Sequence, residues 1–302
     1  MTGIICVNKD KDITSFGTVA KVRGIVREKK AGHTGTLDPM ATGVLPVMLG
    51  GATKFLDYLP DSDKGYGASF LLGKTTDTLD ITGKVTGEYE VSCDIDTVEA
   101  VLEKFRGRIM QLPPMYSAVS VNGQRLYDLA RQGIETERQE RQIEIKRLEL
   151  VRELCNPSES CYVIDVLCSK GTYIRSLVDD IGRELGCGAV MTSLVRTQAM
   201  GFTLNDCVTL EELQRRKDNN ILFDDIVINV EKMFKTYKRV YVSSAQAKRF
   251  SNGGALDLGR IKNPPEQGIC RVCSPDGVFL GLGECDKEKK EISVKRLLVR
   301  RD

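Results

Sequence analysis

Histidine is nearly absent from this sequence, and long apolar runs are absent altogether. His33 is the only histidine among 302 residues. A single imidazole excludes mechanisms that need two, such as an H-E-x-x-H zinc site or a multi-histidine iron or copper centre. No stretch reaches the roughly 18 apolar residues of a membrane-spanning helix, and the opening MTGIICVNKD lacks the basic and then apolar layout of a signal peptide. We therefore expect a cytoplasmic protein that does not bind a membrane.

Cysteine is present ten times, but without the spacing of a metal site. Its scattered distribution along a full-sized chain favours reduced thiols over the disulfide framework of a small secreted protein. Only Cys270 and Cys273 have metal-like spacing, and Cys285 is their one nearby partner, with no histidine to complete four ligands. We interpret them as structural residues of a strand region and expect no metal.

Charge is unevenly distributed along the chain. Residues 1–231 carry 28 Lys and Arg against 34 Asp and Glu, whereas residues 232–302 carry 16 against 8. A basic tail on a mildly acidic body is typical of an anchor for phosphate backbones, although a solvated charged surface is the alternative. The strand-like KRVYVSS and several Gly-rich turns predict that this tail is a small β-rich domain.

Hydrophobic periodicity predicts both strands and helices before residue 232. The expected strands are GIICVNK, YGASFLL, residues 143–150 and CYVIDVLC. The expected helices start at residues 14–15, where Thr14 and Ser15 supply capping groups, at about residue 98, and at Ile174. Residues 32–51, crowded with Gly, Thr and Pro, are expected to form a shaped loop without helix or strand. The fold class expected is α+β.

The Gly- and Thr-rich loop does not match two phosphate chemistries that its composition invites. G-x-x-x-x-G-K-[ST] is missing, and GGATK at residues 50–54 has the wrong order. The piece TGTL at residues 34–37 is similar to the aspartyl-phosphate motif D-K-T-G-T-L, but Gly32 stands where the nucleophilic aspartate belongs. Asp38 remains as the carboxylate of this loop, and Pro39 biases it to an extended backbone. Taken alone, such an aspartate is more often a structural turn residue.

Arg175 stands out because its position opposes the helix dipole. The segment CSKGTYIRSLVDDIGRELGCG predicts a strand end, a glycine turn and a helix, with Arg175 in the first helical turn and off the apolar stripe. A cation there costs about 0.3 to 1 kcal/mol. Such an unfavourable local choice indicates a specific anionic partner.

The string GHTGTLDPMATGVLPVMLGGATKF closely resembles the TruB family of pseudouridine synthases, which isomerise a uridine in the T-loop of tRNA. Further motifs agree in order and spacing over most of residues 1 to about 230: YGASFLLGKTTDTLDITG, LPPMYSAVSVNGQRLYDLARQG, CSKGTYIRSLVDDIGRELGCGA and SLVRTQAMG. The tail piece GVFLGLGECDKEKKEISVKRLL resembles a PUA or PUA-like RNA-binding domain. The resemblance implies the pseudouridine synthase fold over residues 1–231, with a mixed, mainly antiparallel central sheet flanked by helices, and a PUA-like domain over residues 232–302.

The resemblance also implies roles for eight residues. Asp38 would be the catalytic aspartate, Tyr66 the tyrosine packed against the target uracil, and Arg175 the arginine paired to the aspartate. The substrate-binding residues would be Lys9 at the edge of the pocket, His33 in the space left by the flipped nucleotide, Asp80 and Tyr173 on the substrate, and Leu194 lining the pocket. Two departures from the family pattern, Asp10 in place of proline and Ser120 in place of lysine, concern RNA contacts and leave the catalytic residues intact.

The implied reaction is the isomerisation of the uridine at position 55 of tRNA. The bond between N1 and C1′ breaks, the uracil turns, and it is rejoined through C5 with no atoms gained, so we expect neither a cofactor nor a metal. An ionised carboxylate held by a two-pronged arginine pairing can serve as nucleophile. The sequence leaves open whether it attacks the sugar or the base, or instead assists elimination. The target base must be extruded from its folded loop. The expected partner is the T-arm of tRNA, bound by a monomer without an obligate protein partner.

Two other functions remain open at this point. Guide-RNA-dependent relatives share the core motifs, but this chain has no long lysine-rich extension and looks like the stand-alone bacterial form. A tRNA-binding RNA chaperone, with isomerisation secondary or absent, would use the same basic tail and base-flipping loop. Asp38 together with Arg175 favours the enzyme, because a pure chaperone does not need an aspartate held by an arginine.

Overall fold

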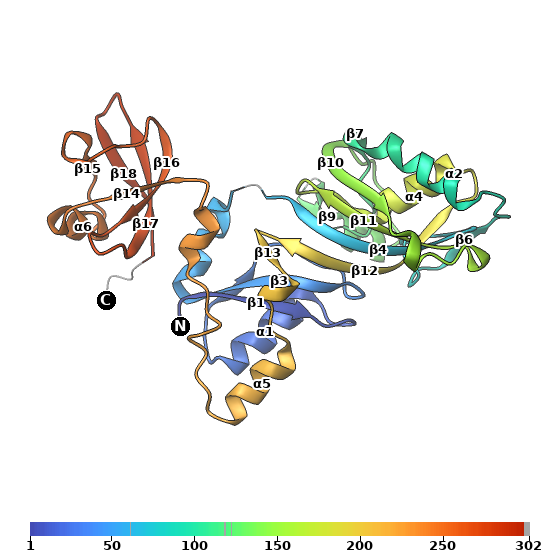
Figure 1. The fold of residues 1–302 in the computed structure, drawn as a ribbon, viewed down its shortest axis with the longest axis horizontal. Coiled ribbons are helices and arrows are strands. Elements are labelled where there is room, and N and C mark those ends of the chain that lie inside the picture. Colours follow the sequence, from blue (N-terminus) through green and yellow to red (C-terminus); the bar gives the residue numbers. More distant parts are fainter. Residues whose placement is uncertain (61, 118, 122, 299–302) are drawn as a thin grey trace.

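A computed structural model of the chain describes residues 1–60, 62–117, 119–121 and 123–298. Figure 1 shows a long curved sheet with helices packed on it and a smaller β-rich domain at its side. The helices are α1 (Ser15–Ile25), α2 (Ile95–Leu102), α3 (Leu126–Arg131), α4 (Ile174–Glu184), α5 (Leu210–Asp218) and α6 (Ser244–Ser251). Within these described ranges, no helix is both long enough and apolar enough to cross a membrane.

The central sheet is mixed and mainly antiparallel, as the sequence predicts. Within the described residues it contains nine strands. Its order is β1 (Gly3–Lys9), β3 (Thr42–Leu49), β12 (Ala189–Ala199), β4 (Lys64–Leu72), β11 (Cys161–Cys168), β10 (Arg141–Leu150) and β7 (Gly107–Gln111), with β2 (Ala31–His33) paired to β3 and β13 (Phe202–Thr203) paired to β12. Between the strands described for this sheet, one pairing is parallel, that of β3 with β12, and it involves two residue pairs, Val195 with Thr42 and Arg196 with Gly43.

Two sets of helices bury different halves of this sheet, and all the predicted strands and helices named above are present. Helix α1 begins where Thr14 accepts a hydrogen bond from the Gly17 amide. It packs with α5 against β1 and β3, whereas α2 and α4 pack against the strands around β4, β11 and β12 (Figure 1). The apolar stripe of α4 is wholly buried, so its periodicity correctly indicated the face that meets the sheet.

The prediction that residues 32–51 contain no strand is wrong, because β3 occupies Thr42–Leu49. Its residues after Thr42 are all buried, and a buried strand is a continuous apolar run without the alternation that was sought. Pro46 lies opposite Cys6 of β1, yet its carbonyl accepts from Thr34 on the other side. The missing proline N–H faces that same side, so Pro46 returns no hydrogen bond to Thr34, and β2 ends at His33.

The C-terminal part is β-rich, as predicted, and its sheet has the order β14 (Lys238–Tyr241), β16 (Gly268–Cys273), β17 (Phe279–Asp286), β18 (Glu291–Leu297) and β15 (Leu256–Asp257). Cys270, Cys273 and Cys285 are all buried in β16 and β17. Short hairpins pair β5 (Lys74–Thr76) with β6 (Val85–Glu88) and β8 (Ser120–Val121) with β9 (Gln124–Arg125).

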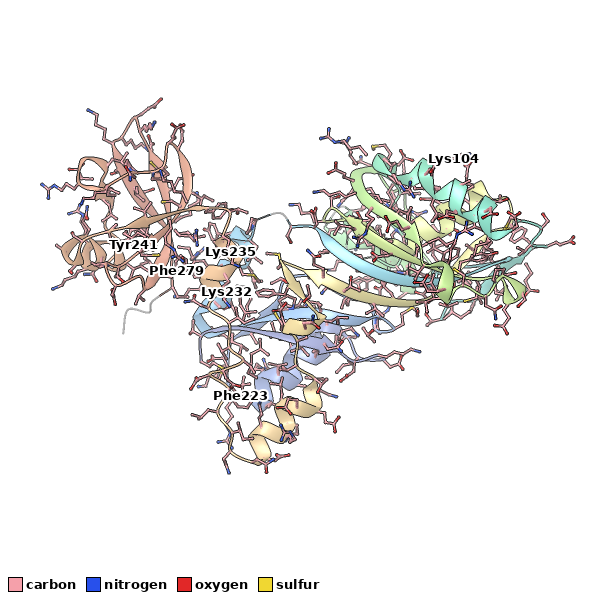
Figure 2. The ribbon with its side chains drawn as sticks, viewed as in Figure 1. Lys104, Phe223, Lys232, Lys235, Tyr241 and Phe279 are labelled. Carbon is pink, nitrogen blue, oxygen red and sulfur yellow. The ribbon has the colours of Figure 1, made fainter. Side chains whose placement is uncertain are left out.

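A shared aromatic cluster joins the two parts of the chain. The ring of Phe55, from the 3-10 turn Gly50–Tyr58, lies 5.6 Å from that of Phe234 and 5.8 Å from that of Phe279. Phe279 belongs to β17, and Figure 2 places it beside the Val230–Phe234 turn that carries Lys232. All three rings are fully or almost fully buried. The smaller domain is therefore packed directly on the larger one.

Candidate active site

Ser15, in helix α1, fixes the loop that carries Asp38. It is the first residue of α1 and is 1% exposed. Its Oγ donates to the Leu37 carbonyl at 3.1 Å and accepts from the Leu37 amide at 2.8 Å. The residue directly before Asp38 thus has both backbone polar groups satisfied by one buried hydroxyl. The sequence suggested Ser15 only as a capping residue, and this second role was missed.

Lys9 lies beneath the same loop and has no exposed surface. Its ammonium donates to the carbonyls of Asp10 at 2.8 Å, Ile13 at 2.7 Å and Pro39 at 3.1 Å. These three bonds use all its donors. Burial lowers the pKa of Lys9 to about 8. In the structure Lys9 holds Pro39, the residue that follows Asp38.

Arg196 of β12 binds the loop from its other end, and the sequence argument missed it. It is 0% exposed. Its Nε donates to the Val44 carbonyl at 2.8 Å, and its two Nη atoms donate to the carbonyls of Gly35 at 3.1 Å and Thr36 at 3.3 Å. Gly43 makes this approach possible. It has φ +106°, and a Cβ there would lie 2.2 Å from the Arg196 carbonyl oxygen.

Asp38 and Arg175 meet in a two-pronged ion pair. Arg175 Nε lies 2.9 Å from Asp38 Oδ2, and Nη2 donates to Oδ1 at 3.2 Å. The remaining guanidinium donors reach the carbonyls of Thr78 at 3.0 Å and Tyr116 at 2.9 Å. The Arg175 side chain is 6% exposed and that of Asp38 is 34% exposed. The arginine is therefore locked in place, while the carboxylate stays open to a substrate.

The position of Arg175 follows from how the start of α4 is held. Tyr173 is at the N-cap position of α4, and its amide donates to Gln111 Oε1 at 2.8 Å while its carbonyl accepts from Gln111 Nε2 at 3.1 Å. Ser176 Oγ donates to the Leu112 carbonyl at 2.9 Å. Gln111 is 2% exposed. These contacts between β7 and α4 set the helix register that points Arg175 at Asp38.

Asp80 is a second carboxylate beside Arg175. Its Oδ2 lies 3.9 Å from Arg175 Nε, and its side chain is 8% exposed. Its Oδ1 accepts from Thr78 Oγ1 at 2.9 Å, from the Thr82 amide at 3.0 Å and from Thr82 Oγ1 at 2.5 Å. Asp80 thereby shapes the turn whose Thr78 carbonyl accepts from Arg175, so it supports the guanidinium on a second side.

Tyr66 and Leu194 form an apolar floor next to the loop. They lie on the neighbouring strands β4 and β12, are 6% and 7% exposed, and belong to the same core cluster as Leu37 and Met40. Burial raises the pKa of the Tyr66 phenol to about 12, with the nearby Arg196 opposing the shift. The phenol is therefore neutral at physiological pH and can donate a proton in a hydrogen bond.

His33 lies at the end of β2, just ahead of the loop. Its Nδ1 accepts from the Gly35 amide at 3.3 Å. Its Nε2 is buried without a hydrogen-bond partner among the residues described. The Phe16 ring stands edge-on to the imidazole at 5.1 Å and is 67% exposed. Burial, followed by the charge of Arg196, lowers the His33 pKa, so the imidazole is neutral at pH 7.

The structure thus gathers Asp38, Arg175 and Asp80 into one cluster of charges, with Tyr66 and Leu194 in the floor beside the loop that Lys9 supports. Over the described residues, no group of three or more His, Cys, Asp or Glu side chains is arranged to hold a metal ion. The carbonyls of Thr78 and Tyr116, which complete the environment of Arg175, have no signal in the sequence, because any residue type supplies a backbone carbonyl.

Comparisons with known proteins agree along the whole chain. Residues 23–174 match the family model described as "TruB family pseudouridylate synthase (N terminal domain)". Residues 175–235 match "tRNA pseudouridylate synthase B C-terminal domain", and residues 239–298 match "Pseudouridine synthase II TruB, C-terminal". The chain is 44% identical over 300 residues to tRNA pseudouridine synthase B of Pseudomonas fluorescens strain Pf0-1, covering 99% of this chain and 96% of that protein. It is 41% identical over 302 residues to the same enzyme of Clostridium perfringens strain 13, covering 99% of both.

Solved structures show the same architecture. A Cbf5-Nop10-Gar1 complex contains a chain with TM-score 0.75 and 25% identity, covering 100% of this chain and 86% of that one. An H/ACA RNP bound to a substrate RNA containing 2′-deoxyuridine contains one with TM-score 0.74 and 23% identity, over the same shares. These likenesses support the predicted pseudouridine synthase fold. The matches over nearly the full length show that the chain belongs to the TruB family of pseudouridine synthases, the enzymes that isomerise uridine to pseudouridine in tRNA.

Proposed function

We propose that the chain isomerises the uridine at position 55, in the T-loop of tRNA, with Asp38 as the catalytic carboxylate. The observation that carries this proposal is the pair of contacts from Arg175 to both oxygens of Asp38, at 2.9 and 3.2 Å. The arginine is buried, whereas a third of the Asp38 side chain is exposed above the apolar floor. A carboxylate that is fixed and still accessible meets the two requirements of a nucleophile or of a base in elimination.

Of the other residues, we assign some to contacts with the uracil and others to positioning Asp38. Tyr66 offers an aromatic face for stacking and, because its pKa is raised to about 12, a phenol that keeps its proton. Leu194 lies beside it in the apolar floor. Lys9 acts through the loop, since its ammonium is already occupied by three carbonyls. We assign to neutral His33 the role of filling the gap that the extruded nucleotide leaves.

We also assign Asp80 and Tyr173 to the residues that bind the substrate. Asp80 already accepts from two threonines on Oδ1, while its Oδ2 is the oxygen that faces Arg175. Tyr173 is bound through its backbone to Gln111, so its phenol is not needed for that contact. The chemistry derived from these residues needs no cofactor.

We assign residues 1–231 to catalysis and residues 232–302 to a PUA-like RNA-binding domain. The smaller domain has a pocket lined by several basic side chains around the half-exposed Tyr241, namely Lys238, Arg239, Arg260 and Lys262. Figure 2 shows Tyr241 on this domain, away from the central sheet. Such a pocket suits a phosphate backbone and a stacked base. We infer a monomeric cytoplasmic enzyme that binds the T-arm.

The basic pocket also fits the alternative of an RNA chaperone, because it contains no part of the catalytic cluster. The two functions differ in what they require of position 55. Transcripts of one tRNA, with uridine or cytidine at that position, are treated with enzyme and mapped by carbodiimide modification and primer extension. Pseudouridine at position 55 alone is the expected result. Tight binding without pseudouridine, or pseudouridine at another position, would overturn the assignment.

A further inference from the structure

Lys64 has a cationic group in the active site that the chemistry described above does not use. It is the first residue of β4 and lies two residues before Tyr66, so both side chains project from the same face of the sheet. A Cβ on Gly35 would lie 3.3 Å from Lys64 Nζ and 3.7 Å from Arg196 Nη1. The ammonium therefore lies close to the loop at Gly35, three residues before Asp38, on the side where Arg196 binds it.

This ammonium has no partner of its own within the described part of the chain, where it makes neither a hydrogen bond nor an ion pair. The adjacent carboxylate, Asp63, pairs with Lys146 at 2.8 Å. Arg196 is the charge with the largest effect on Lys64, and it has the same sign. Its own donors bind neutral groups, namely three carbonyls and the Tyr66 hydroxyl. Burial, followed by this repulsion, lowers the Lys64 pKa to about 8.

Two neighbouring cations without a counter-ion are unfavourable in the free protein. Burial of a charge is costly unless it is paired, and a site that breaks this rule is a candidate for binding an opposite charge. Lys64 is half-buried, so part of the residue is open to solvent. A phosphate of RNA has the required charge and acceptors. Extruding a base turns its nucleotide about the backbone, so the phosphates on either side of it must be held close to the pocket that receives the base.

We propose that Lys64 binds the RNA phosphate adjoining the target uridine and so holds the backbone while the base is extruded. This inference rests on the proposed function, because it takes the uridine next to Asp38 as the target. Arg196 adds its charge to the site while its hydrogen bonds stay with the loop. Lys64 is thus a substrate-binding residue, distinct from Lys9, whose three donors are already taken.

The test is single-turnover tritium release from T-arm stem-loops labelled at uracil C5, with enzyme concentration and KCl varied. It gives the half-saturating concentration and the maximal rate. Loss of one phosphate contact in Lys64→Met should raise the half-saturating concentration about tenfold. It should also reduce the slope of log affinity against log salt by about 0.7. Lys64→Arg should restore the slope, because it keeps the charge.

Lys104→Met is the matched control. Lys104 is 63% exposed and pairs with Glu184 at the end of α4 opposite Arg175. Figure 2 shows it on the side of the larger domain that faces away from the smaller one. Its removal should leave the slope and the half-saturating concentration unchanged. An equal change in slope for both variants would mean that any lysine contributes, which would overturn the specific contact.

A second arm removes the charge from the RNA. Stem-loops carry a methylphosphonate on either side of the target uridine, and one of the two should weaken binding to the wild type about tenfold. The same RNA should bind Lys64→Met no more weakly than the unmodified RNA does. If the loss of affinity from Lys64→Met and the loss from the methylphosphonate multiply at both phosphates, Lys64 binds neither phosphate. If Lys64→Met does not fold, the wild type still tests the proposal. An unchanged affinity of the wild type for both methylphosphonate RNAs would overturn it.

Failure of the proposed function would be visible separately. In that case the wild type would release no tritium from any stem-loop. The salt slopes of RNA binding by wild type, Lys64→Met and Lys104→Met, measured by fluorescence anisotropy, would still decide whether Lys64 contacts a phosphate.

Discussion

Arg175→Met should separate chemistry from binding. The substitution removes both contacts to Asp38 and the donors to two buried carbonyls. Breaking a buried ion pair from one side costs about 3 to 5 kcal/mol of folding free energy. Because a third of the Asp38 side chain is exposed to water, we expect the lower end, about 3 kcal/mol. Unfolding in urea measures this loss.

Turnover should fall much more than binding. Without the guanidinium, Asp38 is no longer fixed, and a displacement of about 1 Å at a reacting group costs roughly 100-fold in rate. Binding is supplied by basic residues elsewhere, so the dissociation constant for tRNA should stay within a few-fold of wild type. Single-turnover tritium release gives the rate, and filter binding gives the affinity.

Arg175→Lys sharpens this experiment. It keeps the charge but replaces the planar fork by a single ammonium, which cannot contact both oxygens of Asp38 in the same way. A rate loss close to that of Arg175→Met would show that orientation matters more than charge. Arg215→Met, at a 60% exposed arginine of α5, is the control and should change neither rate nor affinity. Equal losses of rate and affinity in Arg175→Met would refute the division of roles.

Three further predictions follow from buried groups. His33, the single imidazole, should have a pKa below the ordinary value of 6.5 because it is buried. The NMR signal of its Cε1–H follows the titration. A midpoint at or above pH 6.5 would contradict the burial of this side chain. Because protonation then favours the unfolded chain, the free energy of unfolding should fall as the pH drops through 6.5, and less so in His33→Gln. Ser15→Ala should cost about 1 to 3 kcal/mol in urea unfolding and slow turnover, since it leaves both polar groups of Leu37 unsatisfied; unchanged stability would argue against the contact. Phe234→Ala should cost about 3 to 5 kcal/mol by opening the ring cluster between the two domains, and a loss below about 1 kcal/mol would show that the cluster does not join them.

Periodicity and capping residues predicted most of the fold, but not the strand that follows Asp38. The apolar face of α4 and the cap at Thr14 are local features, and the structure keeps them. Strand β3 was missed because Gly43 and Pro46 look like loop residues. Both residues fit a strand because of partners distant in sequence. The Arg196 backbone approaches Gly43 closely. Strand β2 ends at His33, on the side of Pro46 that lacks an N–H donor. Such long-range contacts cannot be predicted from neighbouring residues in the sequence alone.

The residues that position the site were harder to predict than those that face the substrate. Arg175 stands out through a local conflict, a cation at a helix start. Asp38 taken alone looks like an ordinary turn residue, and the resemblance of residues 32–55 to the family identifies it. Arg196 is fully buried in a strand, where an arginine would ordinarily be exposed, and nothing near it in the sequence reveals the three carbonyls that receive it. The contacts of Lys9 could not be predicted either, because the carbonyls that surround it come together only in the folded chain.

The most direct measurement is tritium release from full-length tRNA transcripts labelled at uracil C5, comparing wild type, Asp38→Asn, and wild type with cytidine at position 55. Joining C5 to C1′ expels the C5 hydrogen to water, so each turnover frees one label. Release of one equivalent per tRNA by wild type, lost in both other reactions while Asp38→Asn still binds tRNA, is the predicted result. Release by Asp38→Asn at the wild-type rate would contradict the role of Asp38, and release from the cytidine transcript would contradict the site.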